Sequence, residues 1–215
     1  MGWFGFCQLG AQSPNIQLPT LPHVTINTTE KSVDVDALVA LHKGKLELVA
    51  CTVGTKEHES VVAIRASAKH VHLMLVLAGA KEGNPYMREA LDDTNTRWRD
   101  VPATGHSIEV SLVFEDDSGE MVEHPISHFI KNENGARYPD RPFLFAGSQL
   151  RQREGESPVY IADVSGNFIT LSSFGDEVLC QPVFESHDND SLQWVVDGAD
   201  LPPIDSEVLL RLRLK

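Results

Sequence analysis

Cysteine is scarce in this sequence, with Cys7, Cys51 and Cys180 far apart and no Cys-x-x-Cys pair. Iron–sulfur clusters and zinc knuckles need closely spaced cysteine ligands, so this spacing argues against both groups. Cys51 ends an apolar stretch and Cys180 follows Val178 and Leu179, so both are interpreted first as small buried hydrophobic residues. A Cys51–Cys180 disulfide stays the alternative, because the sequence gives no distance between the two sulfurs.

Positive charge and long apolar runs are also scarce. Eighteen Lys and Arg residues stand against 31 Asp and Glu residues, which gives a formal net charge of −13. This excess repels the phosphates of nucleic acids and anionic lipids, so we expect no nucleic-acid partner. The longest strongly apolar stretch, Val71 to Ala80, falls far short of the roughly 20 residues that a spanning helix needs, so no membrane span is expected.

What the chain does contain is enough for one folded domain. Its 215 residues are 41% hydrophobic and 23% charged, which is typical of a globular protein with a buried core. Residues 1–22 differ, because an apolar start gives way to a polar, proline-containing stretch. This start resembles the end of a secretory signal peptide, although it lacks a basic region. We therefore predict a leader-like or flexible segment, residues 1–22, and a single domain, residues 23–215. The expected location is periplasmic or secreted, with cytoplasmic as the alternative.

Strict alternation of apolar and polar residues predicts half-buried antiparallel strands along much of the chain. Val24–Asn27 and Ser32–Ala37 alternate strictly, and Ser107–Phe114 and Glu207–Leu214 are predicted as two further strands. Two further apolar runs, Lys45–Cys51 and Ser60–Ile64, predict a hairpin around an eight-residue loop. The Asp-Asp-Ser-Gly sequence at 116–119 predicts a second hairpin turn, and a third hairpin is expected between 158–162 and 168–171.

One helix is predicted with well-defined ends. Ser67 is a good N-cap residue, Gly79 is a good residue to follow the last turn, and the residues between them are almost all apolar in the later turns. A helix that is apolar all round is normally buried on several sides, so we expect Leu73, Val76 and Leu77 in the core.

A second, short helix is predicted from Pro125 to Glu133, with proline at its first position. The connection from Lys81 to Thr104 is expected to carry a helical turn at Met87–Leu91. Together these elements predict an α+β fold: mostly antiparallel β-sheet, with one central buried helix and one short helix.

The loop between the two runs of the first hairpin concentrates chemically useful side chains. Lys56, Glu57, His58, Glu59 and Ser60, here called the tip loop, follow one another directly. His58 and Glu59 can act as a metal ligand and a carboxylate, or as an acid and a base, and Ser60 is a further catalytic candidate. No standard motif is complete: valine stands where the zinc-protease motif H-E-x-x-H needs its second histidine, and no G-x-S-x-G surrounds the serine. A solvated loop whose charges only keep it in water is the plain alternative.

Three more residues are candidate ligand-binding groups that the fold can bring to the tip loop: His72, His128 and Asp163. His70 and His72 lie two apart on the predicted helix, about 200° around its axis, and therefore cannot share one metal ion. His124 and His128 are four apart, a spacing that allows one face. A bound metal therefore stays possible, and no other cofactor is predicted.

Several short stretches together resemble one family. They are Gly54–Val62, His70–His72, Phe143–Ser148, Tyr160–Asn167 and Leu201–Pro203. In this order they resemble the YdjY-domain family of bacterial proteins, from about Val24 to the C-terminus. The resemblance implies a protein of largely uncharacterised function, commonly found behind an export signal. The ferredoxin-like label that the family has carried gains no support from the cysteine spacing.

Two classes of function follow. The first is an extracytoplasmic binding or accessory module that presents the tip loop to a small ligand or a protein partner. The second is a hydrolase or metal-assisted enzyme that uses His58 and Glu59 with help from His72, His128 or Asp163. A second histidine or aspartate close to His58 would favour the enzyme, and a lone exposed loop would favour the module.

Overall fold

The computed structural model describes residues 18–92, 94, 96–152, 155, 157–188 and 191–215, and these form mostly strands. The strands are β1 Val24–Asn27, β2 Ser32–Val39, β3 Leu48–Thr52, β4 Ser60–Ile64, β5 Met87–Ala90, β6 Trp98–Val101, β7 Ser107–Glu115, β8 Met121–Pro125, β9 Ile130–Asn132, β10 Phe143–Phe145, β11 Leu150–Arg151, β12 Val159–Tyr160, β13 Ile169–Thr170, β14 Leu179–Cys180, β15 Trp194–Val196 and β16 Glu207–Leu214. The helices are α1 Ala68–Leu77 and α2 Ile161–Ser165, with 3₁₀ turns η1 Glu57–Glu59 and η2 Ile126–Phe129.

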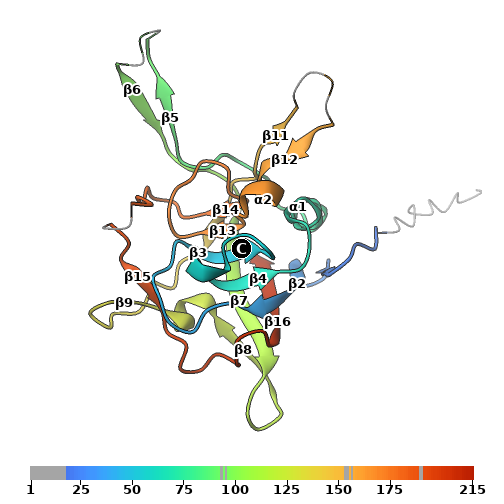
Figure 1. Ribbon diagram of the computed structural model, residues 1–215. Coiled ribbons are helices and arrows are strands. Elements are labelled where there is room, and N and C mark those ends of the chain that lie inside the picture. The colour runs from blue at the N-terminus through green and yellow to red at the C-terminus, as the bar shows by residue number, and fades with distance from the viewer. Residues whose placement is uncertain (1–17, 93, 95, 153–154, 156, 189–190) are drawn as a thin grey trace, which may run out of the picture.

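Eight of the strands close into a barrel (Figure 1). Their order is β2-β16-β7-β10-β14-β13-β3-β4, and the pairing of β4 with β2 completes the ring. β1 extends the sheet beside β2, and β8 pairs with β7. The fold is therefore mostly β, and the predicted α+β class with a central buried helix is wrong.

Alternating side chains explain why the long strands form this sheet. In β2, Val33 and Val35 are fully buried, and in β16 Leu210 and Leu212 are as well, whereas the residues between them are partly exposed. Every second side chain therefore joins one continuous hydrophobic core, which also includes Ile108, Val110, Leu112 and Phe114 of β7. The strands predicted from period-two alternation are confirmed.

The predicted hairpin between β3 and β4 is wrong, because the two strands run parallel, with Leu48 opposite Ser60 and Thr52 opposite Ile64. Residues 53–59 therefore carry the chain back along the full length of β3. Both strands are buried on both faces, which is typical of parallel strands. Their continuous apolar runs do not reveal strand direction, and this is why the sequence suggested the simpler hairpin.

Helix α1 begins and ends where the sequence predicts, but it packs on the outside of the barrel against β1, β2 and α2. Gly79 has a φ of +101°, and the Gly79 and Ala80 amides donate to the Val76 and Leu75 carbonyls, which is a Schellman ending. Strand side chains fill the interior of an eight-stranded barrel and leave no room for a helix. Only one side of α1 is buried, so Leu73, Val76 and Leu77 are exposed and their predicted place in the core is wrong.

Three other predicted segments also differ. Met87–Ala90 forms strand β5, which pairs with β6 in a projecting hairpin, where a helical turn was expected (Figure 1). Residues 161–165 form α2 where a hairpin was expected, and the second helix is reduced to the 3₁₀ turn η2. The turn at 116–119 joins β7 to β8 as predicted. Among the described residues, no helix has both the length and the apolar character needed to cross a bilayer.

The predicted N-terminal segment lies largely outside the described residues, which begin at Leu18. Leu21, near the end of that segment, pairs with Val24 and packs against the core.

Candidate functional site

The tip loop is fixed by hydrogen bonds at both of its ends. Ser60 Oγ donates to the Lys56 carbonyl oxygen at 2.8 Å, and the Glu47 amide donates to the Glu59 carbonyl oxygen at 3.1 Å. Gly54, with a φ of +84°, turns the chain so that its amide donates to the Glu57 carboxylate. These bonds hold the loop against the residues that precede β3.

Two carboxyl groups and one ammonium group meet beneath the tip loop. Lys56 Nζ lies 3.3 Å from Glu59 Oε1 and 3.8 Å from Glu47 Oε2. Glu47 is only 9% exposed, and this burial raises its pKa. The neighbouring Glu59 raises the pKa of Glu47 further, against the smaller opposing effect of Lys56. Glu47 is therefore a carboxyl group with a raised pKa beside an ion pair.

Aromatic rings from a distant segment complete this arrangement. Lys56 Nζ stands 4.1 Å from the centroid of the Phe174 ring, a cation–π contact. The His187 ring stacks on Phe174 with a centroid separation of 5.3 Å. We call Glu47, Lys56, Glu59, Phe174 and His187 the tip cluster.

Three members of the tip cluster were missed by the sequence reasoning. Glu47 had a weak signal, because it is a charged residue inside an apolar run that the pattern assigned to a strand. Phe174 and His187 had none, because only the fold brings residues so distant in sequence to Lys56.

The predicted catalytic residues do not form a catalytic set. The His58 side chain is 76% exposed, and its Nε2 lies 3.8 Å from Glu59 Oε2, too far for a hydrogen bond. Ser60 is fully buried, and its hydroxyl already donates a hydrogen bond to the Lys56 carbonyl oxygen. The Glu57 carboxylate accepts a hydrogen bond from the Gly54 amide. Among the described residues, the Glu59 carboxylate lies beside His58 at a distance too long for a hydrogen bond, so the tip loop presents the imidazole to solvent.

His72 is a residue of α1, and its side chain belongs to a hydrogen-bonded network that is separate from the tip cluster. Its Nδ1 is 2.8 Å from the Tyr160 hydroxyl, and its Nε2 is 3.0 Å from Glu82 Oε2. The Ser148 amide donates to the same Tyr160 oxygen at 3.2 Å, so the hydroxyl can give its own proton to Nδ1. Burial lowers the pKa of His72 and raises the pKa of Tyr160, which favours this neutral arrangement.

Asp163 and His128 are likewise committed to local partners. Asp163 accepts hydrogen bonds from the Ser67 hydroxyl and the Ala68 amide, and so caps α1 from α2. Arg137 donates to His128 Nδ1 at 2.8 Å, which leaves Nε2 to donate to Asp200 at 2.7 Å. Neither residue is brought to the tip loop.

His124 lies in β8 and His128 in η2, and their rings stack with centroids 4.8 Å apart, so the two side chains lie together but not on one face of a helix. Within the described ranges, no group of three or more His, Cys, Asp or Glu side chains is arranged to hold a metal ion. Cys51 and Cys180 are both buried and free, so the alternative of a disulfide between them is not observed. Burial raises the pKa of both thiols.

A hollow of about 320 Å³ adjoins the tip cluster through a shared residue, Phe174. Tyr86 and Phe184 add two further rings, 5.0 Å apart, and Arg88 lies over Phe184. Gln149 contributes a polar group to the wall. We call this the aromatic hollow. Aromatic walls with a few polar groups are typical of small-ligand sites.

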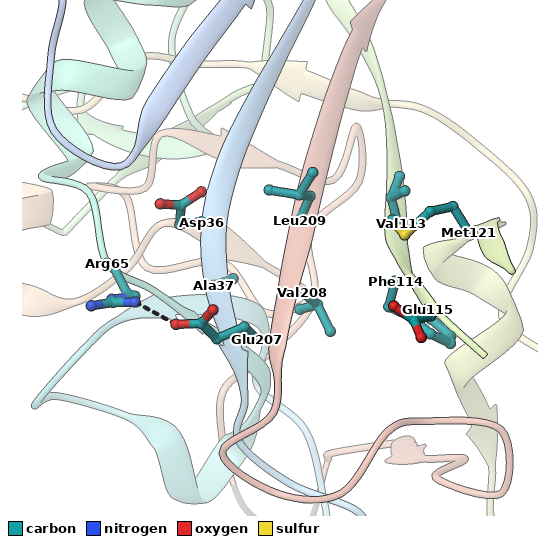
Figure 2. A pocket seen from close by; sticks show the side chains of 10 residues that line it. All are labelled: Asp36, Ala37, Arg65, Val113, Phe114, Glu115, Met121, Glu207, Val208 and Leu209. Carbon is teal, nitrogen blue, oxygen red and sulfur yellow. Dashed lines mark hydrogen bonds and ion pairs between the residues drawn. The ribbon is translucent and has the colours of Figure 1, made fainter. Parts of the chain in front are cut away.

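Another hollow, of about 330 Å³, lies over β2, β16 and β7 (Figure 2). Figure 2 shows Arg65 reaching across to Glu207, and their side chains form an ion pair at 2.8 Å. Leu209, Val113 and the exposed Met121 provide its apolar surface. Arg65 follows β4 and Glu207 lies in β16, so this ion pair spans β2, which lies between those two strands.

The fold and the site define a mostly β barrel domain whose charged loop stands beside an aromatic hollow. The family model described as the YdjY domain matches residues 24–213. The chain therefore belongs to the YdjY-domain family, as the resemblance in its sequence implied. Neither the curated proteins nor the solved structures contain a match to it.

Proposed function

We propose that this protein is an extracytoplasmic binding module that presents the tip loop to a small ligand or a protein partner. The exposure of His58 is the observation that carries the proposal. A catalytic imidazole is oriented by a hydrogen-bonded partner, whereas His58 is 76% exposed and stands 3.8 Å from Glu59. An exposed imidazole on an anchored loop suits recognition better than proton transfer. The extracytoplasmic location rests on the leader-like composition of residues 1–22.

The chemistry of the site indicates a mixed ligand. Tyr86 and Phe184 offer ring surface to a flat, weakly polar group beside Phe174, whose own ring already contacts Lys56 and His187. Lys56 and Glu59 offer opposite charges at the edge of the same surface. A ligand that stacks in the aromatic hollow can therefore place a polar group against the tip cluster.

The second candidate function is hydrolysis, and Glu47 is the observation that favours it. Its raised pKa suits a general acid, and the neighbouring Glu59 carboxylate contributes to raising that pKa. Hydrolysis at this site would depend on Glu47 more than on His58. A Glu47→Gln variant that loses a measurable hydrolytic activity would establish it, since the amide keeps the shape but carries no transferable proton.

The first testable prediction concerns the double variant His58→Ala/Glu59→Ala. The His58 side chain is exposed, and the Glu59 side chain, 19% exposed, gives up one ion pair with Lys56, so their removal should change the free energy of unfolding by no more than about 1 kcal/mol. Binding should be lost in saturation-transfer NMR with amino acids, monosaccharides, nucleotides and divalent metal ions. The variant Phe174→Ala should weaken binding of the same ligand, because it removes part of the wall of the aromatic hollow.

His23→Ala/Glu30→Ala is the matched control, because it removes one exposed histidine and one exposed glutamate near β1. The control should bind like the native protein. Equal binding by the tip-loop variant and the control would place the site elsewhere. Outright unfolding of the tip-loop variant would show that His58 and Glu59 are structural anchors.

A further inference from the structure

A hollow of about 570 Å³ lies where the loop before β3 meets β15 and the segment after it, and Lys131 of β9 also lines it. It shares no residue with the tip cluster or the aromatic hollow. Val195, Val196 and Ala199 give it an apolar wall. We call it the lysine hollow.

The charge of its lining is opposite to that of the whole chain. Lys43, Lys45 and Lys131 are three of the eight lysines in the sequence, and all three line this hollow. Asp197 is the single acidic residue among the lining residues, and it pairs with Lys131 at 2.9 Å. In a protein with a formal net charge of −13, this lining carries an excess of positive charge.

Two glycines build the hollow by allowing the two segments to approach closely. A Cβ at Gly198 would lie 2.5 Å from the carbonyl oxygen of His42, and Gly44 has a φ of +143°. The Val196 amide donates to the Gly44 carbonyl oxygen at 3.1 Å and ties the segments together. The backbone geometry therefore fixes Lys43 and Lys45 at the rim of a preformed depression.

We propose that the lysine hollow binds a small organic anion, with a carboxylate or phosphate head against the lysines and an apolar body against Val195 and Ala199. Ammonium groups form strong charge-assisted hydrogen bonds with both kinds of head group. The apolar wall excludes water from one side of the bound molecule and favours an anion that carries hydrocarbon over a bare inorganic ion.

The experiment uses four probes on the full chain: benzoate, phenyl phosphate, inorganic phosphate as a head group alone, and benzyl alcohol as an uncharged ring. Isothermal titration gives the affinities, and amide shifts of Gly44 and Gly198 give the place of binding. We expect benzoate or phenyl phosphate to bind more tightly than the other two probes and to shift both glycine amides. No saturable binding of either organic anion, or binding that leaves both amides unshifted, would overturn the proposal.

The variant Lys43→Gln/Lys45→Gln should lower the affinity for benzoate and phenyl phosphate at least about tenfold, because each ammonium group contributes a charge-assisted hydrogen bond. Lys69→Gln/Lys81→Gln removes the same charge from exposed positions outside the hollow and should leave the affinities unchanged. Asp197→Asn removes the opposing carboxylate and should tighten binding. An equal loss of affinity in both lysine variants would show that the loss comes from the change in net charge, and it would contradict a binding site at the lysine hollow.

Discussion

At the scale of single residues, the least ordinary group in the barrel wall is the Glu177 side chain. It is completely buried, and Oε2 accepts the Asp176 amide at 2.9 Å. Oε1 finds no hydrogen-bond partner within the part of the chain that the structure describes. Burial raises the pKa of Glu177 to about 7. The folded protein therefore favours the protonated form of this carboxyl at mildly acidic pH.

This shift predicts how stability depends on pH. Because the folded pKa of about 7 lies above the ordinary value of 4.5, the stabilising contribution is fully present below pH 4.5 and is lost as pH rises through 7. The loss for this one group amounts to about 3 kcal/mol, since each pKa unit corresponds to roughly 1.4 kcal/mol. Glu177→Gln should remove this decline from urea unfolding curves measured between pH 4.5 and 8.

The native protein measured at the same pH values is the reference, because other carboxyl groups titrate equally in both forms. Parallel pH profiles for the native protein and Glu177→Gln would contradict the raised pKa of Glu177.

At the scale of elements, α1 shows how an apolar helix can lie on a surface. Its buried residues are Ala68, Val71, Met74 and Leu75, which meet β1, β2 and α2. Its N-terminus is capped by Asp163 from another element, because the Ser67 hydroxyl is itself bound to Asp163. The helix is therefore held by one face and by one carboxylate from α2.

Substitutions of two leucines on α1 test which face of the helix is buried. Leu75 is completely buried, so Leu75→Ala should cost about 2–5 kcal/mol through lost burial and a cavity. Leu77 is 38% exposed, so Leu77→Ala should cost less than about 1 kcal/mol. Chemical denaturation of the two variants measures both values. A larger loss for Leu77 than for Leu75 would mean that the helix presents its other face to the barrel.

At the scale of the whole molecule, the barrel is closed by the two ends of the described chain. β16, the last strand, lies between β2 and β7 and pairs with both along nearly its whole length. Arg211 joins Asp34 of β2 to Glu123 of β8 across this strand. Closure therefore depends on contacts between residues at opposite ends of the sequence, which pair late and cooperatively.

Two truncations test this closure. Removal of residues 207–215 takes out the strand between β2 and β7, so the shortened chain should not show a cooperative thermal transition. Removal of residues 1–12, which lie outside the described residues, should leave the thermal midpoint unchanged because a polar, proline-containing stretch separates them from the first strand. Circular dichroism melting compares both with the full chain. A folded C-terminal truncation, or a large loss on N-terminal truncation, would contradict these roles.

The sequence allowed the elements to be predicted better than their arrangement. Alternation in β2, β7 and β16 depends on nearest neighbours and identifies a strand wherever one face is buried. The C-terminal end of α1 was predictable for the same reason, because Gly79 acts within one turn. Ser67 marks the start of the helix, but its hydroxyl is bound to Asp163 of α2 and the cap is therefore a tertiary contact. The parallel course of β3 and β4 was not, since a buried apolar run has the same pattern in either direction.

The candidate site divides in the same way. The sequence by itself determined the YdjY-family membership, the strand pattern and the tip loop, because each is a property of contiguous residues. Only the tertiary structure placed Glu47 and Phe174 against Lys56 and separated His72 and His128 from the loop. These contacts join residues far apart in the chain, and they exist only once the barrel has closed and buried the apolar faces of its strands.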